Sequence, residues 1–342
     1  MGAQGATGRA GRSGAPNLLW YAPADMGEAA ADRERAVETN RAVQSSRATG
    51  IGVVAILLWA ALALLTVRAG SIPPVELLSL CFSIAFLAGI AMLGSRGSTA
   101  LAQLRQPLQP WLTAFFAIFL YHALYFYALS AAPPARASLI AYLWPLLIVL
   151  MSAMSTAGGS ERLRPRHLVG ALLGLAGTCL VVLGRGGAGP ATGSALGYVA
   201  AACCALVWSS YSVVNRRFAT TPSAMIVGVC GAVALAGAAC HVMFETITVW
   251  PGASQWVAIA GLGVGPTGLA FLAWDFATKH GNLPLLGALS YLAPVVSTLL
   301  LTATGAVPAS ASLFVSAFLV IAGALVATGV RLAPSSSGAS NA

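Results

Sequence analysis

The sequence predicts an all-α integral membrane protein with ten transmembrane helices, arranged as two inverted repeats of five helices. Three observations lead to this prediction: an apolar composition, a series of apolar segments of membrane-spanning length, and an internal repeat. The chain has 342 residues, of which 58% are hydrophobic and only 8% are charged. An ordinary soluble domain carries about 25% charged residues. This chain therefore has too little polar surface to cover a globule in water.

The apolar part of the chain divides into segments of the length that a bilayer requires. A transmembrane helix needs about 20 mostly apolar residues. Short turns separate ten such segments, at about 49–67, 73–93, 110–130, 134–155, 168–184, 194–214, 223–243, 253–275, 283–303 and 309–330.

Basic residues between these segments predict the orientation of the chain. With the N-terminus inside, thirteen Lys and Arg residues fall on the cytoplasmic side and three, Arg68, Arg136 and Arg185, fall on the other. An excess of positive charge marks cytoplasmic loops, so we expect both termini in the cytoplasm. The same distribution argues against nucleic-acid binding, because the formal net charge of +9 is not gathered on one solvated face.

Two passages repeat along the chain at one spacing. The sequence AYLWPLLIVL aligns with SYLAPVVSTL, which places Pro145 and Pro294 149 residues apart, and Trp59 and Trp208 show the same separation. This period divides ten spans into five and five. Because five is odd, the second half must cross the membrane in the opposite sense. Inverted repeats are typical of secondary transporters, whose substrate site lies near the midplane between the halves. The alternative is a duplication kept for packing alone.

Polar segments flank the two repeats. Residues 1–47 lack the apolar core of a signal peptide, and their polar composition predicts a disordered extension. The first repeat is expected at 48–184 and the second at 193–331. Residues 332–342 are expected to form a disordered tail.

The passages YHALYFYALSAAPPARASLIAYLWPLLIVL, from Tyr121, and WDFATKHGNLPLLGALSYLAPVVSTLL, from Trp274, carry a family resemblance. They resemble the EamA-type transporters of the drug/metabolite transporter superfamily, which are built as two five-helix repeats, and the likeness covers about residues 48–331. Within that group the aromatic-rich parts resemble the exporters of aromatic amino acids. The resemblance implies a multi-pass protein of the bacterial inner membrane. It implies export of aromatic or other hydrophobic amino acids and related small metabolites, by alternating access.

Polar and aromatic side chains inside the apolar segments are the candidates for a substrate site, since such residues in a membrane are usually functional. Tyr121, His122 and Tyr125 lie within about one helical turn, so they can share a face. Trp208 is a further candidate, and Trp59 is its counterpart in the first repeat. The alternative for His122 is a structural residue with its hydrogen bonds satisfied, and for Trp208 an anchor at the membrane interface.

Each repeat also places polar or aromatic residues just before a proline. Tyr142 and Trp144 precede Pro145, and Ser290 and Tyr291 precede Pro294. Proline removes a backbone hydrogen bond and breaks a helix, and broken helices at matched positions point to a substrate site. We therefore expect helix breaks at both prolines and these four side chains in one central cavity with the others. An aromatic plug between helices is the alternative.

Other classes of function lack their signatures. No carboxylate is expected at mid-membrane, since Asp275 is assigned to the end of its segment near Lys279, and this disfavours bare cations as substrates. No H-E-x-x-H or G-x-S-x-G sequence indicates an enzyme, although a membrane-embedded enzyme stays a less favoured alternative. An exporter of sulfur-containing or small neutral amino acids is the nearer one. The six cysteines lack metal-ligand spacing, so we expect no metal and no cofactor. The expected partners are a small-molecule substrate and the lipid bilayer, with no nucleic acid and no required oligomeric partner.

Overall fold

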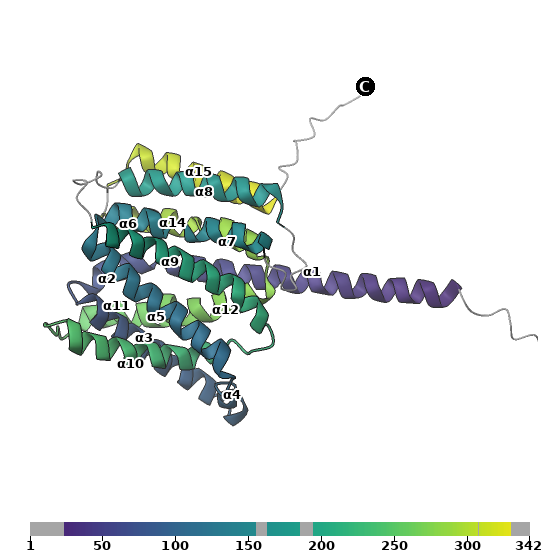
Figure 1. Cartoon of the computed structure of the whole chain (residues 1–342), viewed down its shortest axis with the longest axis horizontal. Helices are drawn as coiled ribbons and strands as arrows, with labels where there is room; N and C mark the ends of the chain where they lie inside the picture. Colours follow the sequence, from purple (N-terminus) through teal and green to yellow (C-terminus); the bar gives the residue numbers. More distant parts are fainter. Residues whose placement is uncertain (1–23, 155–162, 185–193, 307, 330–342) are drawn as a thin grey trace, which may run out of the picture. The chain divides into compact units, whose positions relative to one another are not determined.

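The computed structural model describes residues 24–154, 163–184, 194–306 and 308–329, and every regular element within them is helical (Figure 1). The helices of the first half are α1 Ala24–Ala60, α2 Leu62–Ala69, α3 Pro74–Gly94, α4 Ser98–Ala102, α5 Leu108–Ala131, α6 Pro134–Ala141, α7 Trp144–Met154 and α8 Pro165–Gly184. Those of the second half are α9 Ala195–Val214, η1 Asn215–Phe218, α10 Met225–Phe244, α11 Ala253–Val264, η2 Gly265–Leu269, α12 Ala270–His280, α13 Leu283–Leu289, α14 Leu292–Ala303 and α15 Ala311–Thr328.

Eight helical segments in the described part of the chain are long and apolar enough to cross a membrane. They run from Ala31–Ala69 to Ala311–Thr328, and several combine two of the helices above. The segment Arg136–Ser152 is a shorter apolar helix, and α8 is a further helix of 20 residues. The prediction of an all-helical membrane protein is confirmed.

The N-terminal extension differs from expectation where the structure describes it. Residues 24–47 are helical and belong to α1, whereas residues 1–23 and the tail 332–342 lie outside the described residues. The sequence from Ala24 is rich in Ala, Glu and Arg, which are strong helix formers. An exposed pair three residues apart, in which Arg35 donates to Asp32 at 2.8 Å, adds a little support. The expected disorder therefore does not extend to this part.

Two spans are interrupted at positions 148 residues apart, close to the repeat spacing of 149. The first break separates α6 from α7 at Tyr142–Leu143, and the second separates α13 from α14 at Ser290–Tyr291. Each break is followed within four residues by a proline, Pro145 or Pro294. Proline is tolerated in the first turn of a helix, where its missing N–H has no intrahelical partner. The chain therefore ends one helix and starts another just before each proline.

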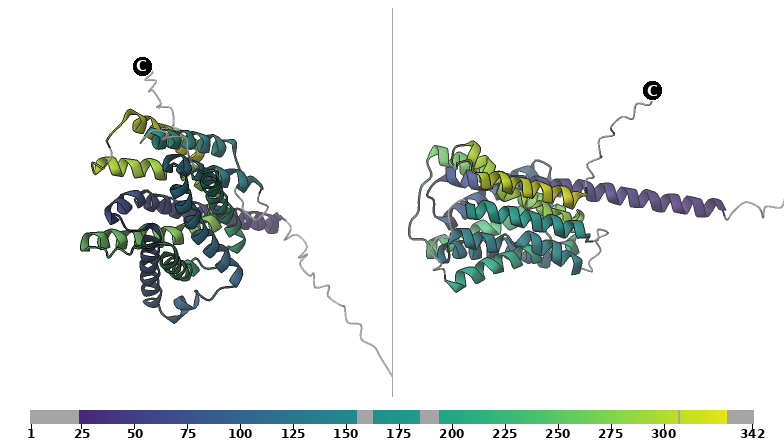
Figure 2. Two further views of the ribbon diagram at one scale, coloured as in Figure 1. Left: turned by 60° about the vertical axis from the view of Figure 1, so that its left-hand side comes forward. Right: turned by 90° about the horizontal axis from the view of Figure 1, so that it is seen from above.

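Several helices pack in pairs through their small residues. Figures 1 and 2 show α8 beside α15, and α3 contacts α10 while α5 contacts α9. At the crossing of α8 and α15, a Cβ added to Gly323 would lie 2.6 Å from the carbonyl oxygen of Gly170. Small residues at such crossings let two membrane helices approach closely. Gly170 and Gly323 therefore let α8 and α15 pack closely.

We expect Gly323→Ala to destabilise the folded protein by about 1–3 kcal/mol, because the new methyl group must push α8 and α15 apart. Gly50→Ala is the matched control, since nothing lies within 4 Å of a Cβ at that helical position. Thermal unfolding in detergent measures both variants. Equal melting temperatures for the two would show that α8 and α15 pack less closely than the structure indicates.

Candidate functional site

Four tryptophans from four helices meet in the main buried cluster of the protein. The ring of Trp59 (α1) lies 5.8 Å from Trp208 (α9) and 5.2 Å from Trp274 (α12), and Trp144 (α7) lies 5.8 Å from Trp274. Phe271, one turn before Trp274, contacts Trp59 at 5.7 Å and Trp208 at 5.6 Å. Aromatic rings at 4.5–7 Å attract one another in edge-on and offset geometries. We refer to these five residues as the ring cluster.

The candidates on α5 join this cluster from one side. Tyr121 lies 5.8 Å from Trp208 and stacks on Tyr125 at 5.9 Å. His122 contacts Phe271 at 6.2 Å and Phe82 of α3 at 5.5 Å. The structure thus brings Tyr121 and His122 against the ring cluster, with Tyr125 behind Tyr121.

Hydrogen bonds fix two of these side chains. His122 Nδ1 donates to the carbonyl oxygen of Ile118 at 2.7 Å, because a carbonyl can only accept. The hydroxyl of Tyr125 lies 3.2 Å from the hydroxyl of Ser138 on α6. Both rings are therefore held at defined positions on the inner side of α5.

The pattern of exposure along α5 shows which way these three rings face. One face carries an exposed row that includes Phe116, Leu120 and Tyr127. On the opposite face Ile118 is fully buried, whereas Tyr121, His122 and Tyr125 are half-buried. These three rings therefore lie on the inner side of α5, away from the exposed row.

The break between α6 and α7 sets the positions of the next two candidates. Trp144 begins α7 and is 7% exposed, with its ring in the ring cluster. Tyr142 lies in the break itself and is half-buried. Residues two apart point to different faces of a regular helix, so the break changes how these two side chains can be directed.

Ser290 and Tyr291 lie elsewhere. Tyr291 is fully buried in a second cluster with Val149, Val295 and Val320, and its ring packs on the backbone of Gly174 in α8. Ser290 donates to the carbonyl oxygen of Leu286 at 2.7 Å, within its own helix. The described contacts therefore do not place these two residues with the ring cluster. The repeat makes Tyr291 equivalent to Tyr142 along the chain, but two equivalent side chains need not face the same neighbours.

Three contributors were missed by sequence reasoning: Trp274, Phe271 and Phe82. Phe271, Trp274 and Asp275 are spaced three and four apart, so they share one face of α12. That face also carries Thr278, and all four residues are buried. This spacing could have been recognised in the sequence, because a carboxylate on the same helical face as two aromatic residues is unusual in a membrane segment.

Asp275 corrects the expected bound of its segment. It does lie in the last two turns of its span, but α12 continues to His280 and Asp275 is 0% exposed. Its carboxylate is paired with Lys279, whose Nζ lies 2.7 Å from Oδ2. The pair carries no net charge. A carboxylate is therefore buried close to the ring cluster, but it is neutralised on its own helix.

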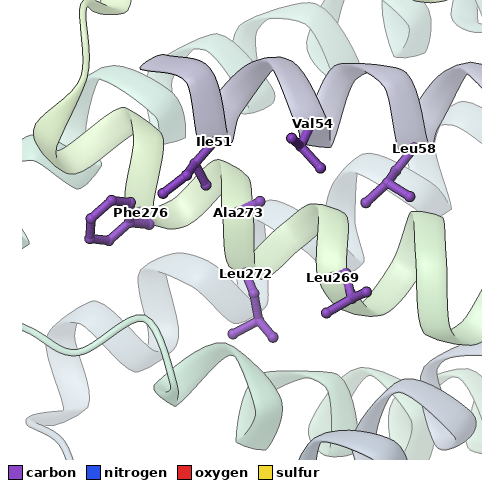
Figure 3. Close-up of a pocket in the computed structure, with 7 residues that line it drawn as sticks. All are labelled: Ile51, Val54, Leu58, Leu269, Leu272, Ala273 and Phe276. Carbon is purple, nitrogen blue, oxygen red and sulfur yellow. The ribbon is translucent and has the colours of Figure 1, made fainter. Parts of the chain in front are cut away.

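A groove of about 440 Å³ lies between α1 on one side and η2 and α12 on the other, and its lining differs from that of the ring cluster (Figure 3). Its lining side chains are all apolar: Ile51, Val54, Leu58, Leu269, Leu272, Ala273 and Phe276. Such a lining offers nothing to the charged ends of an amino acid. The groove is therefore not a candidate for the polar part of a substrate.

The helical bundle, its span lengths and its buried aromatic centre define a polytopic membrane protein. The chain belongs to the EamA-like transporter family, whose model matches residues 48–183. It is 50% identical over 284 residues to the aromatic amino acid exporter YddG of Ancylobacter novellus, covering 83% of this chain and 97% of that protein. It is 27% identical to the exporter of the same name from Escherichia coli, covering 82% and 96%. A solved crystal structure is similar with a TM-score of 0.76 and 49% identity, covering 83% of this chain and 98% of the other. The predicted family resemblance is confirmed.

Proposed function

We propose that this chain is a secondary transporter that exports aromatic or other hydrophobic amino acids, by alternating access between two inverted five-helix repeats. The observation that carries this proposal is the ring cluster, because both halves of the chain contribute to it. Trp59 and Trp144 come from the first half, and Trp208 and Trp274 come from the second. The names of the similar exporters support the same class of substrate.

Helix contacts support the inverted repeat. If each half contributes five spans, α3 corresponds to α10, α7 to α14 and α8 to α15. Helices α3 and α10 contact each other, as do α8 and α15. A two-fold axis between the halves would bring such counterparts together. The same axis would relate the contact of α5 with α9 to that of α11 with α2, and both contacts are present.

The chemistry of the site favours a zwitterion with an apolar side chain. Tryptophan and tyrosine faces provide stacking surface for an aromatic ring, while His122 and the tyrosine hydroxyls can meet polar groups. The buried carboxylate of Asp275 is neutralised by Lys279. A bare cation would have no free counter-charge among the described residues of this cluster, and burying it would cost several kcal/mol.

We assign substrate contact to the half-buried and buried rings that meet in the structure: Tyr121, His122, Tyr125, Tyr142, Trp144 and Trp208, with Trp59, Phe271 and Trp274 added. Ser290 and Tyr291 lie instead at the break between α13 and α14. No catalytic step, metal or cofactor is proposed.

Counterflow in liposomes tests the function. The purified protein is reconstituted with one unlabelled amino acid inside, and uptake of the same amino acid in labelled form is measured for phenylalanine, tryptophan, methionine, cysteine and alanine in turn. We expect the aromatic amino acids to be taken up fastest. Fast counterflow of cysteine or alanine alone would favour the alternative exporter of sulfur-containing or small neutral amino acids. Absence of counterflow for every amino acid would refute the proposal.

We also propose a bacterial inner-membrane location with both termini in the cytoplasm. A cysteine introduced at the exposed Ala306 should then react with an impermeant thiol reagent in intact cells, whereas one at Thr220 should not. The expected periplasmic loop at 186–192 lies outside the described residues. Labelling of position 220 without labelling of 306 would reverse the orientation.

A further inference from the structure

The most completely buried charges in the described protein form a network at one end of the bundle. Lys279 Nζ donates to Asp275 Oδ2 at 2.7 Å and to the carbonyl oxygen of Thr221 at 3.0 Å. Both side chains of the ion pair are 0% exposed. We refer to this end, where η1 and the C-terminus of α12 lie, as the η1 end.

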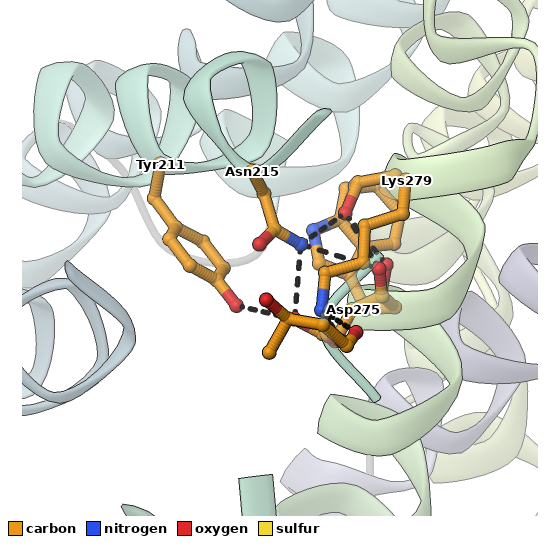
Figure 4. Close-up of polar contacts among 7 residues, drawn as sticks. Tyr211, Asn215, Asp275 and Lys279 are labelled. Carbon is orange, nitrogen blue, oxygen red and sulfur yellow. Dashed lines mark hydrogen bonds and ion pairs between the residues drawn. The ribbon is translucent and has the colours of Figure 1, made fainter. Parts of the chain in front are cut away.

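Other bonds of this network connect α12 to α9 and η1 (Figure 4). The hydroxyl of Tyr211 donates to Asp275 Oδ1 at 3.2 Å, and Asn215 Nδ2 donates to the same oxygen at 3.0 Å. Asn215 also donates to Thr278 Oγ1 at 2.9 Å. The carboxylate is thus held by its own helix through one oxygen and by the neighbouring helix through the other.

Two contacts join α9, which carries Tyr211 of the network, to the ring cluster. The ring of Tyr211 lies 5.3 Å from that of Trp208. The indole nitrogen of Trp274, the residue before Asp275, donates to Ser212 at 3.1 Å. A change in how α9 meets α12 would therefore move rings of the proposed substrate site.

The opposite end of the bundle has no such network at the equivalent positions. In the repeat register, Asp275 and Lys279 correspond to Phe126 and Ser130, and Tyr211 and Asn215 correspond to Leu62 and Thr66. These residues cannot form an ion pair. Toward that end, where α5 finishes and α9 begins, Tyr121 and Tyr125 are half-buried, whereas Tyr211 and Trp274 at the η1 end are fully packed.

Stability alone does not explain a buried ion pair in this place. Removing two charges from water costs about as much as their attraction returns, so apolar side chains can often replace such a pair without loss. A network of a few reversible hydrogen bonds across two helices is suited to holding one arrangement and releasing it. Alternating access requires a contact of this kind at whichever end is closed.

We propose that Asp275, Lys279, Tyr211 and Asn215 form a latch that closes the η1 end of the transport pathway and opens once in each cycle. Asp275 and Lys279 act as positioning residues, and they act through Tyr211 on the ring of Trp208. The inference rests on the proposed alternating-access function. It adds the end at which the transport pathway is closed and the residues that close it.

Distances between spin labels test the latch without needing a substrate. In a background without the six native cysteines, one pair of labels is placed at Thr220 and His280, which are exposed at the η1 end. A second pair is placed at Arg68 and Ser130, exposed at the opposite end. Pulsed electron resonance in liposomes then reports the distance distribution at each end.

Tyr211→Phe is the sharpest variant, because it removes the hydroxyl and keeps the ring on Trp208. Loss of one net hydrogen bond changes a two-state ratio by about twofold to tenfold. We expect the longer-distance population at the η1 end to rise by that factor, and the distance at the opposite end to shorten in the same fraction of molecules. Asp275→Asn with Lys279→Met should shift both distances in the same direction, without leaving a single buried charge. Tyr198→Phe, on α9 but outside the network, should change neither distance.

Transport kinetics separate a latch from a structural contact. If Tyr211→Phe populates the η1-open state, the apparent KM for uptake from the η1 side should fall by a similar factor, because apparent affinity scales with the population of the competent state. The KM from the other side should not fall. Unchanged distances in Tyr211→Phe and in the double variant, or an equal rise of KM on both sides, would overturn the latch. If the variants show these distance changes but the wild-type protein transports no amino acid, the proposed substrate is refuted and the latch stands.

Discussion

Replacing Trp144 or Trp208 by alanine should lower uptake of phenylalanine and tryptophan by about fivefold to a hundredfold. Each ring is less than 10% exposed and contacts other members of the ring cluster, Trp144 through Trp59 and Trp274, Trp208 through Trp59 and Phe271. Burial of a large apolar side chain is worth about 1–3 kcal/mol. A substrate ring that stacks against the same surface loses a comparable part of its binding energy.

Initial rates in liposomes over a range of substrate concentrations measure this effect. Trp250→Ala is the matched control, because Trp250 is 86% exposed and lies outside the ring cluster. Tyr125→Ala should reduce uptake too, since it removes the ring that stacks on Tyr121. Transport lost in the Trp250 variant and retained in the other three would show that the ring cluster is a packing core and that substrate passes elsewhere.

The sequence predicted those features that depend on neighbours along the chain. Helical spacing placed Tyr121 and His122 within one turn of each other, and in the structure both lie against the ring cluster. The repeat placed both helix breaks, because proline acts on the turn in which it stands. Trp59 and Trp208, which are counterparts in the repeat, also contact each other, with ring centroids 5.8 Å apart.

The remainder depends on how helices rotate against one another, which spacing alone does not determine. Tyr291 and Tyr142 are equivalent in the repeat, yet Tyr291 packs on α8 and Tyr142 is half-buried at its break. The expected segment 253–275 ended at Asp275, four residues before Lys279. The two charges lie one turn apart and neutralise each other, so the helix continues to His280 with both buried.

That neutralisation leads to the second large effect, on stability. Asp275→Leu should destabilise the protein by about 3–5 kcal/mol, because it leaves the ammonium group of Lys279 buried without its partner. It also removes the acceptor for Tyr211 and Asn215. Adding Lys279→Met should recover most of the loss, since the pair is then replaced by two apolar side chains of similar length.

The double variant should not regain the full stability of the wild-type protein. Asn215 keeps its bonds to Thr278 Oγ1 and to the backbone carbonyl of residue 275, but Tyr211 loses its acceptor. An unsatisfied buried hydroxyl costs about 1–3 kcal/mol, so a further Tyr211→Phe should restore stability toward the wild-type value. Thermal unfolding in detergent follows the series, with Asp32→Ala as the control for an exposed pair of the same kind, which should leave the midpoint unchanged. If the single Asp275→Leu variant unfolds at the same temperature as the double variant, the ammonium group of Lys279 reaches water in solution, and the η1 end is not closed.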